Sequence, residues 1–505
     1  MSRCLFLYEI TSHIFTFVRQ LDEKPPDDVE PIIRDQAIGR RTLASLARTC
    51  RAFHKPAVAI LWAKLDNLDP LIKLLPRGAW TERRWRIPRK RIKERHWLTF
   101  CKYASHVRSL GVPDTTIYGL SQYNATTAHA LSQYNAITAL ARYTKAEFPL
   151  LPNLTHLVWT DRPTAPTLKY LVGERVTDVT LFVFWPPQDS PDVAILSELS
   201  TLCPNVSTLA LFVPPTFSQQ VAAIVQRWPK LRSFSSLALP QTVMDQLTSR
   251  RGLESLSIEL DNTASPVYIG SLPATLRTFS LDGGSAGRYV RYLHKAYGFP
   301  ESFTLKVYVD GSTTEDIMEL LCMLPEHLDQ TALRELSIKL VTSSSPELPR
   351  TFPLELQALS PLFTFRSLRI VDLDTFDSGE LDDTAFSDIA RSWPAITHFA
   401  FGTGSVKPCT KPRATVNALI VLLTYCRNLA SLHLAFDGTA TPPVELPATT
   451  MNMRITRLQV GYSPIRDVAA ISRCFARLMP KLRKITAYRF SVEHYGRWAA
   501  VQGML

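Results

Sequence analysis

Apolar residues recur along most of the chain in one short pattern, in which the first, fourth and sixth positions are apolar. The last three positions alternate apolar, polar, apolar, which predicts a short β-strand with one buried face. The copies lie at Val107/Leu110/Val112, Leu154/Leu157/Trp159, Val176/Val179/Leu181, Val206/Leu209/Leu211, Leu253/Leu256/Ile258, Leu276/Phe279/Leu281, Leu333/Leu336/Ile338, Leu368/Val371/Leu373, Ile396/Phe399/Phe401, Leu429/Leu432/Leu434, Ile455/Leu458/Val460 and Leu482/Ile485/Ala487, with a weaker one at Leu231/Phe234. This repetition indicates a repeat protein.

A four-residue segment, here called the lead-in motif, precedes several copies and mostly carries proline at its second position. It reads Leu-Pro-Asn-Leu from 151, Cys-Pro-Asn-Val from 203, Trp-Pro-Lys-Leu from 228, Trp-Pro-Ala-Ile from 393, Cys-Arg-Asn-Leu from 426 and Met-Pro-Lys-Leu from 479. Helical apolar spacing precedes the copies at 193–202, 217–228, 313–324, 381–393, 414–426 and 468–479. Because proline ends a helix, the predicted unit is a helix, a turn and a short strand.

Stacked units of this kind give an α/β fold with a parallel strand ladder on one side and helices on the other. The copies are spaced mostly about 22–35 residues apart, near or above the ~20–29 residues of leucine-rich repeats. We therefore expect an irregular leucine-rich-repeat-like solenoid, a horseshoe, over residues 98–505. A doubly wound α/β domain is the alternative, but it would not reuse one lead-in motif so often.

The phase of the strand pattern predicts which residues face outward. In the unit 368–373 the apolar positions should face the core, so Ile370 and Asp372 should line the concave side. By the same phase, His433 and Gln459 should be exposed on that side. We expect these four residues to contribute to binding a protein substrate.

Acidic residues are concentrated between 372 and 383, which raises the possibility of a calcium site. The spacing fails the EF-hand pattern, so helix N-capping by Asp382 or Asp383 is the preferred interpretation. The loops at 374–380 and 402–411 follow strands and are long enough to form a recognition rim. No metal ligand is assigned anywhere in the chain, and no cofactor is expected.

The first 76 residues show helical rather than strand periodicity. Leu7, Ile10, Ile14 and Val18 are spaced as one helical face, and a polar connection follows from Leu21. Two further helical patterns cover 43–53 and 57–62. Three short helices with a small common core are expected, either self-contained or completed by a partner.

This N-terminal stretch resembles an F-box, and most closely the F-box-like proteins of mushroom-forming fungi. The resemblance rests on Glu-Ile-Thr-Ser-His-Ile-Phe at 9–15, Leu-Ala-Ser-Leu-Ala-Arg-Thr-Cys-Arg-Ala-Phe at 43–53, Leu-Trp at 61–62, and the leucine- and proline-rich 65–76. It implies that residues 1–76 dock on a Skp-family adaptor, which a cullin scaffold joins to a ubiquitin-conjugating enzyme. The array would then be the substrate-receptor part of an SCF-type ubiquitin ligase. Carried over by position, the adaptor contacts are Leu7, Ile10, Ile14, Leu43, Leu46, Cys50 and Phe53.

Residues 77–97 form a basic connector between the two parts. Eight basic and two acidic residues between 82 and 95 contribute +6 of the formal net charge of +12. Trp85 lies within the run and Trp97 just after it, and interleaved aromatic and basic residues can bind nucleic acid. A solvated connector is the preferred interpretation, so nucleic acid is only a minor alternative as a partner.

The eight cysteines are scattered and form no C-x-x-C pair, which favours reduced thiols in the cytoplasm or nucleus. No apolar run approaches the ~20 residues of a membrane span, so a membrane partner is not expected. His54 has no partner close in sequence and is interpreted as a surface histidine. No motif of an enzyme is present, and no catalytic residue is assigned. A ligase-independent interaction scaffold remains the main alternative to the receptor hypothesis.

Overall fold

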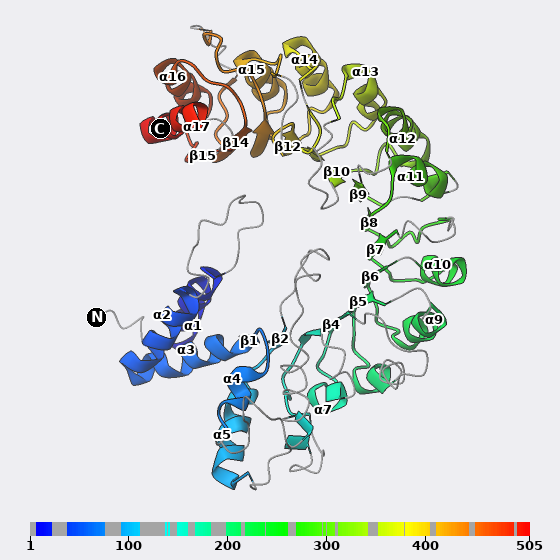
Figure 1. The fold of residues 1–505 in the computed structure, drawn as a ribbon, viewed down its shortest axis with the longest axis vertical. Coiled ribbons are helices and arrows are strands. Elements are labelled where there is room, and N and C mark those ends of the chain that lie inside the picture. The colour runs from blue at the N-terminus through cyan, green and yellow to red at the C-terminus, as the bar shows by residue number, and fades with distance from the viewer. Residues whose placement is uncertain are drawn as a thin grey trace. The chain divides into compact units, whose positions relative to one another are not determined.

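A computed structural model describes most of the chain. The described residues are 7–22, 38–75, 92–111, 137–138, 140–141, 149–159, 167–182, 198–213, 218–237, 239–260, 269–294, 296–298, 300–308, 312–341, 352–377, 379–404, 411–443, 450–488 and 492–505. The fold divides into two compact units, residues 1–235 and 236–505, each of which contains parallel strands with helices on one side (Figure 1).

In the first unit each strand pairs in parallel with the next one along the chain. Its strands are β1 (Lys64–Leu65), β2 (Ser109–Leu110), β3 (His156–Trp159), β4 (Asp178–Phe182) and β5 (Thr208–Phe212). Strand β6 (Ser233–Leu237) spans the division between the units. The ladder thus begins at Lys64, within the segment that the sequence assigned to the N-terminal helices and ahead of the expected start of the array at 98.

The second unit repeats this arrangement with longer strands. They are β7 (Ser255–Glu259), β8 (Thr278–Asp282), β9 (Ser302–Tyr308), β10 (Glu335–Val341), β11 (Ile370–Leu373), β12 (His398–Phe401), β13 (Ser431–Leu434), β14 (Arg457–Gly461) and β15 (Lys484–Ala487). Every neighbouring pair is parallel and consecutive. A doubly wound sheet reverses its strand order at one point, so the observed order excludes that alternative and confirms a solenoid.

Helices cover one face of each ladder. In the first unit they are α4 (Asp69–Ile72), α5 (Glu94–Ala104), α7 (Leu168–Leu171) and α9 (Ser218–Arg227). In the second unit they are α10 (Gln241–Thr248), α11 (Ala286–Leu293), α12 (Thr314–His327), α13 (Leu356–Leu359), the 3-10 helix η5 (Ser360–Thr364), α14 (Asp383–Ser392), α15 (Val416–Tyr425), α16 (Val468–Leu478) and α17 (Val492–Met504). Within this unit the strands form the inner side of an arc and the helices the outer side (Figure 1).

The core consists of the apolar residues of the repeated pattern. Wherever the structure describes them, the residues of all the copies but the last are buried. In the last copy Leu482 is buried, whereas Ile485 and Ala487 are only half-buried. No further strand follows β15 in the described chain, so its outer edge would be left with unpaired backbone groups.

The side-chain amide of Gln502 on α17 occupies this edge. Its Oε1 accepts from the backbone N–H of Ile485, and its Nε2 donates to the carbonyl of Arg483 at 2.7 Å. A residue of a further parallel strand, paired with Lys484, would make the same two hydrogen bonds. Gln502 therefore ends the ladder by replacing one peptide group of the missing strand.

The lead-in motif forms a tight turn that aligns neighbouring repeats. In each described copy the N–H of the fourth residue donates to the carbonyl of the first, as Val206 does to Cys203 at 3.4 Å and Leu231 to Trp228 at 3.2 Å. The first positions of successive motifs also contact each other, because Trp228 Nε1 donates to the Cys203 carbonyl at 2.7 Å. The repeated motif thus determines both the turn and the stacking distance.

Helices α1 (Tyr8–Gln20), α2 (Ile38–Thr49) and α3 (Arg51–Ala63) form a small cluster in the first unit. Its centre consists of Phe15, Leu43 and Ala57. Rings of Phe15 and Phe53 meet edge to face with centroids 5.5 Å apart. The number of helices agrees with the apolar spacing, but the second and third helices divide at Cys50 and not near Pro56, which lies inside α3.

A buried carboxylate joins α1 to α2. Asp22, with a side chain only 3% exposed, accepts from the N–H of Gly39 at 2.6 Å and of Arg40 at 3.0 Å, so it caps α2 from the end of α1. Arg19 pairs with the same carboxylate at 2.7 Å. Sequence analysis assigned Asp22 to a polar connection, because capping between distant segments leaves no periodic signal.

Gly39 allows this close approach, since a Cβ there would overlap the carbonyl oxygen of Val18 and contact the Asp22 carboxylate. We predict that Gly39→Ala lowers the free energy of unfolding of the helical cluster by about 2 kcal/mol, because α1 and α2 must separate. Thermal and urea denaturation followed by circular dichroism measure the effect. Gly496→Ala in α17 is the matched control, because a Cβ there meets no atom within 4 Å. Equal stability of Gly39→Ala and wild type would contradict this packing.

Candidate functional site

Helix α1 presents a row of exposed apolar side chains, here called the α1 stripe. Its members follow helical spacing and are exposed to 51% (Leu7), 38% (Ile10), 42% (Ile14), 58% (Phe17) and 63% (Leu21). The opposite face of the helix buries Thr11 and Phe15 against the cluster. A contiguous exposed apolar row is costly in water and is typical of a surface that a partner covers.

The predicted adaptor contacts fall into two groups. Leu7, Ile10 and Ile14 belong to the α1 stripe, and Cys50 is also exposed. Leu46 and Phe53 are partly buried and pack against the core of the cluster.

The prediction that Leu43 contacts the adaptor does not fit its position in the structure. Its side chain is fully buried at the centre of the helical cluster. It therefore supports the position of α2 and cannot reach a partner while the three helices stay packed.

The apolar spacing predicts Val18 on the same helical face as Leu7, Ile10 and Ile14, and it assigns no role to Phe17 or Leu21. In the structure Val18 packs inward, and Phe17 and Leu21 complete the stripe. Positions 17 and 18 are both compatible with Ile14 on one helical face, so periodicity alone cannot separate them. The position of α3 relative to α1 decides between them.

The strands of the second unit carry a second candidate surface, here called the strand face. In β7–β10 the outward positions paired in one row are Ser257, Ser280, Thr304 and Ser337. The row continues through Asp372, Ala400, His433 and Gln459. Small hydroxyl side chains thus give way to charged and larger polar ones toward the C-terminal repeats.

Alternation in β11 follows the predicted phase. Val371 and Leu373 are buried, whereas Ile370 and Asp372 are half-buried on the outward side. Asp372 forms an ion pair with Lys339, whose Nζ lies 2.9 Å from Oδ2, and accepts from Ser337 Oγ at 3.4 Å. The lysine side chain remains 44% exposed, so the pair can exchange contacts with a bound partner.

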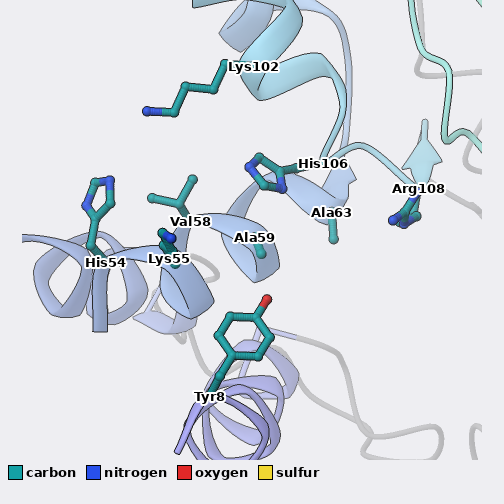
Figure 2. A pocket seen from close by; sticks show the side chains of 9 residues that line it. All are labelled: Tyr8, His54, Lys55, Val58, Ala59, Ala63, Lys102, His106 and Arg108. Carbon is teal, nitrogen blue, oxygen red and sulfur yellow. The ribbon is translucent and has the colours of Figure 1, made fainter. Parts of the chain in front are cut away.

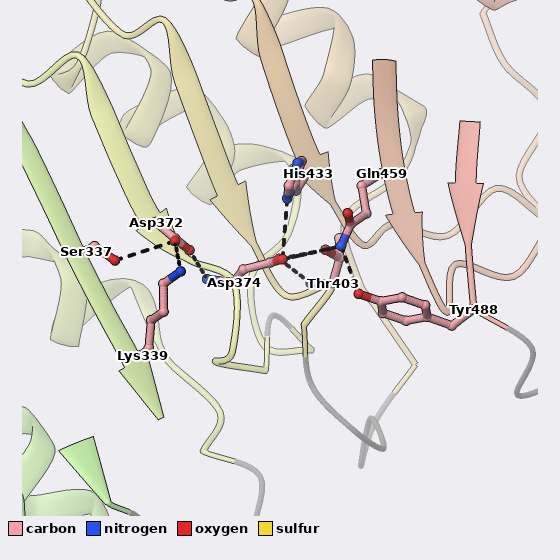
Figure 3. Close-up of polar contacts among 8 residues, drawn as sticks. All are labelled: Ser337, Lys339, Asp372, Asp374, Thr403, His433, Gln459 and Tyr488. Carbon is pink, nitrogen blue, oxygen red and sulfur yellow. Dashed lines mark hydrogen bonds and ion pairs between the residues drawn. The ribbon is translucent and has the colours of Figure 1, made fainter. Parts of the chain in front are cut away.

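Figure 3 shows a polar network beside this ion pair, centred on Asp374. Its Oδ1 accepts from the N–H of Thr403 at 2.8 Å and from the Thr403 hydroxyl at 2.7 Å. Its Oδ2 lies 3.4 Å from His433 Nδ1 and 3.5 Å from Gln459 Nε2. Gln459 Nε2 also donates to Tyr488 Oη at 2.9 Å, so the five consecutive repeats from β11 to β15 share one network.

Tyr488 is held in its neutral form. Burial raises the pKa of its phenol, and the nearby Asp374 and Tyr462 raise that pKa further. A neutral hydroxyl can both accept from Gln459 and donate. The network is therefore a preorganised polar surface with fixed donors and acceptors.

Of the four residues predicted to bind substrate, the structure brings His433 and Gln459 together around Asp374. Asp372 is linked to the Asp374 network by one hydrogen bond, in which its Oδ1 accepts from the N–H of Asp374 at 3.3 Å. Ile370 lies outside the network. Gln459 is 9% exposed, less open than its position in the strand predicted, because Tyr488 and Thr403 contact it. Tyr488 was missed because it follows the last strand of the pattern.

The acidic stretch 372–383 has a structural role. Asp382 caps α14 by accepting from the N–H groups of Thr384 and Ala385, which confirms the capping prediction. The hydrogen bond from the Thr384 hydroxyl, together with these N–H bonds, lowers the pKa of Asp382. Asp383 instead accepts from the N–H and hydroxyl of Thr415, both at 2.7 Å, at the start of α15. In the described parts of the chain, no group of three His, Cys, Asp or Glu side chains is placed to hold a metal ion.

The described cysteines differ in how exposed they are to solvent. Cys203, Cys426 and Cys474 are buried, and burial raises the thiol pKa to about 12, about 12 and about 11 respectively. Cys50 and Cys322 are exposed free thiols.

The basic run lies mostly outside the described residues, which resume at Ile92. Beyond it, Trp97 stacks on Phe100 within α5, with centroids 5.6 Å apart. No helix among the described residues has both the length and the apolar character needed to cross a membrane.

Comparison with known proteins found no matching family model and no similar curated protein. Among solved structures, the complex of Rad7 and Elc1 from yeast aligns at 13% identity over 72% of this chain and 85% of that chain, with a TM-score of 0.31. An internalin, inlF, from Listeria monocytogenes aligns at 13% identity over 68% and 82%, with a TM-score of 0.28. The repeat architecture therefore rests on the strand order and registers of the chain itself.

The two carboxylates of the strand face should differ in their contribution to stability. We predict that Asp374→Ala lowers the free energy of unfolding by about 2–3 kcal/mol, because the buried N–H and hydroxyl of Thr403 lose their acceptor. Asp372→Ala is the matched control and should cost less than about 1 kcal/mol, since its ion pair is partly solvated. Urea denaturation of the full chain measures both, and equal losses would contradict the assignment.

Proposed function

We propose that this chain is the substrate-receptor subunit of an SCF-type ubiquitin ligase. In this proposal α1–α3 dock on a Skp-family adaptor that a cullin scaffold holds, and the strand face of the second unit binds a protein substrate. The exposed α1 stripe is the observation that carries the proposal. The chain acts by binding, and no catalytic group is assigned to it.

The small size of the helical cluster supports a docking role. Three residues form its fully buried centre, and the remaining apolar residues are only partly covered. The stripe belongs to the segment that resembles an F-box, at Glu9–Phe15, where the family contacts its adaptor. A partner that covers Leu7, Ile10, Ile14 and Phe17 would remove this apolar surface from water.

Residues that hold the three helices together are distinct from those that would contact the adaptor. Asp22 and Gly39 fix α2 against α1, and Leu43 fills the centre between the helices. Changes at these positions would abolish docking indirectly by unfolding the cluster. Variants on the stripe itself therefore give the cleaner test.

The strand face supports the second half of the proposal. It combines a flat row of small hydroxyl side chains on β7–β10 with the ion pair of Lys339 and Asp372 and the Asp374 network. Small side chains allow a partner's backbone to approach, and the charged groups provide orientation. Helices of the second unit pack their buried apolar residues against the other side of the strands.

For adaptor docking, we predict that Ile14→Asp weakens binding to a purified Skp-family adaptor by about 2 kcal/mol or more, roughly thirtyfold, because a charge enters a desolvated apolar contact. Ser45→Asp, on an exposed position of α2, is the matched control and should bind normally. Calorimetric titration gives both affinities, and circular dichroism should show unchanged helix content.

Absence of adaptor binding by the wild-type chain would reject the ligase proposal. Retained capture of another protein by the strand face would then favour the ligase-independent scaffold. Leu43→Asp should lose helix content in the same assay, which separates unfolding from a lost contact.

For the substrate, we predict that Asp372→Lys reduces capture of a partner from cell extract by at least about tenfold, because the reversal breaks the pair with Lys339 on the strand face. Asp388→Lys on the helical side, in α14, is the matched control and should capture normally. Quantitative mass spectrometry of the captured proteins is the measurement. Two charged residues that the sequence pattern also suggests for charge reversal, Lys407 and Arg489, lie outside the described residues. Loss with Asp388→Lys alone would place the substrate on the helices instead.

A further inference from the structure

A cavity of about 580 Å³ opens in the first unit between α3 and α5. We call it the α3–α5 pocket. Figure 2 shows side chains reaching it from α3, from α5 and the segment that follows, and from α1. Its lining consists of Tyr8, His54, Lys55, Val58, Ala59, Ala63, Lys102, His106 and Arg108.

Five of these nine side chains are basic and none is acidic. His54 and Lys55 come from α3, whereas Lys102 comes from α5, and His106 and Arg108 come from the segment between α5 and β2. Among the described residues, neither Lys55 nor Lys102 forms an ion pair with a carboxylate, and Lys102 Nζ lies 5.6 Å from the centroid of the Tyr103 ring. Like charges that converge without a counterion repel one another, and a bound anion would relieve that repulsion.

The basic groups on the α5 side of the pocket lie close enough to affect one another. Burial lowers the pKa of His106, and the charges of Arg108 and Lys102 lower it further. Arg108 is also fixed in place, since its Nη1 donates to the carbonyl of Asn153 at 3.2 Å. His54, which the sequence left as a surface histidine, is oriented by a 3.0 Å contact of its Nδ1 with the carbonyl of Ala47.

The remaining lining is apolar. Val58, Ala59 and Ala63 form one wall, and Tyr8 points toward it from α1. The volume falls within the ~300–1,000 Å³ of small-molecule sites. An apolar wall between two groups of cations matches a compact molecule with anionic groups at separate positions.

We propose that the α3–α5 pocket binds a small organic polyanion, a compact molecule with at least two phosphate or carboxylate groups. One anionic group would lie near Lys102, His106 and Arg108, and another near His54 and Lys55. The body of the molecule would contact Val58, Ala59 and Ala63. This inference goes beyond the receptor function and does not depend on the adaptor, because the pocket is built from the chain's own residues.

The test uses the full chain and calorimetric titration at low ionic strength. Fructose 1,6-bisphosphate is the phosphate probe, citrate is the carboxylate probe, and fructose is the uncharged control. We expect one of the two anions to bind with one-to-one stoichiometry and fructose not to bind. The stronger of the two identifies the anionic group that the pocket prefers.

Variants then locate the binding. Lys102→Gln and Lys55→Gln should each weaken the preferred probe by about tenfold, since each loses a charge-assisted contact. Lys73→Gln is the matched control, because it removes the same charge from an exposed position of the same unit outside the pocket. Binding should also raise the pKa of His106, followed by NMR, since an anion opposes the effect of Arg108 and Lys102.

Failure of both anions to bind would overturn the proposal. So would equal weakening by Lys73→Gln, which would indicate a general attraction to the basic protein. Unchanged thermal unfolding of the variants without ligand excludes loss of fold as the cause. Adaptor binding is measured separately with Ile14→Asp, so the two proposals can fail independently.

Discussion

Parallel pairing of consecutive strands is the constraint on which both units depend. At the start of most strands, one carbonyl of the preceding repeat accepts two consecutive N–H groups, as Arg369 does from Thr397 and His398 at 2.7 and 3.0 Å. This bond fixes the register, and the register fixes which side chains face the helices. Apolar residues then fill the core at positions 4 and 6 of every described copy but the last, and mostly polar residues form the strand face.

The last strand of a parallel ladder has backbone N–H and C=O groups that no further strand pairs, and at one end of this ladder a side chain pairs with them. Gln502 supplies a side-chain amide in place of a peptide group beside β15. At the other end the ladder begins at β1, directly after α3, so the helical cluster is continuous with the first strand. The helices that carry the α1 stripe are thereby attached to the array through α3, without a long connection.

The two surfaces that carry the proposals differ in their chemistry for physical reasons. The α1 stripe is apolar because a three-helix cluster of this size has too little volume to bury all its large side chains. The strand face is polar because alternate residues of every strand point away from the core. The α3–α5 pocket is basic, and it forms where α3 and α5 meet, so neither helix alone defines it.

The sequence by itself determined the repeated unit, the strand phase and the three N-terminal helices, because each depends on local periodicity and on the turn chemistry of proline. Burial of Val371 and Leu373 and the capping by Asp382 followed from such signals. Only the tertiary structure decided that Leu43 is buried, that Phe17 rather than Val18 is exposed, and that Asp374, His433, Gln459 and Tyr488 meet. These outcomes depend on which segments that are distant in the sequence pack together, as with Asp22 and Gly39. The local spacing of apolar residues does not depend on such contacts and therefore cannot predict them.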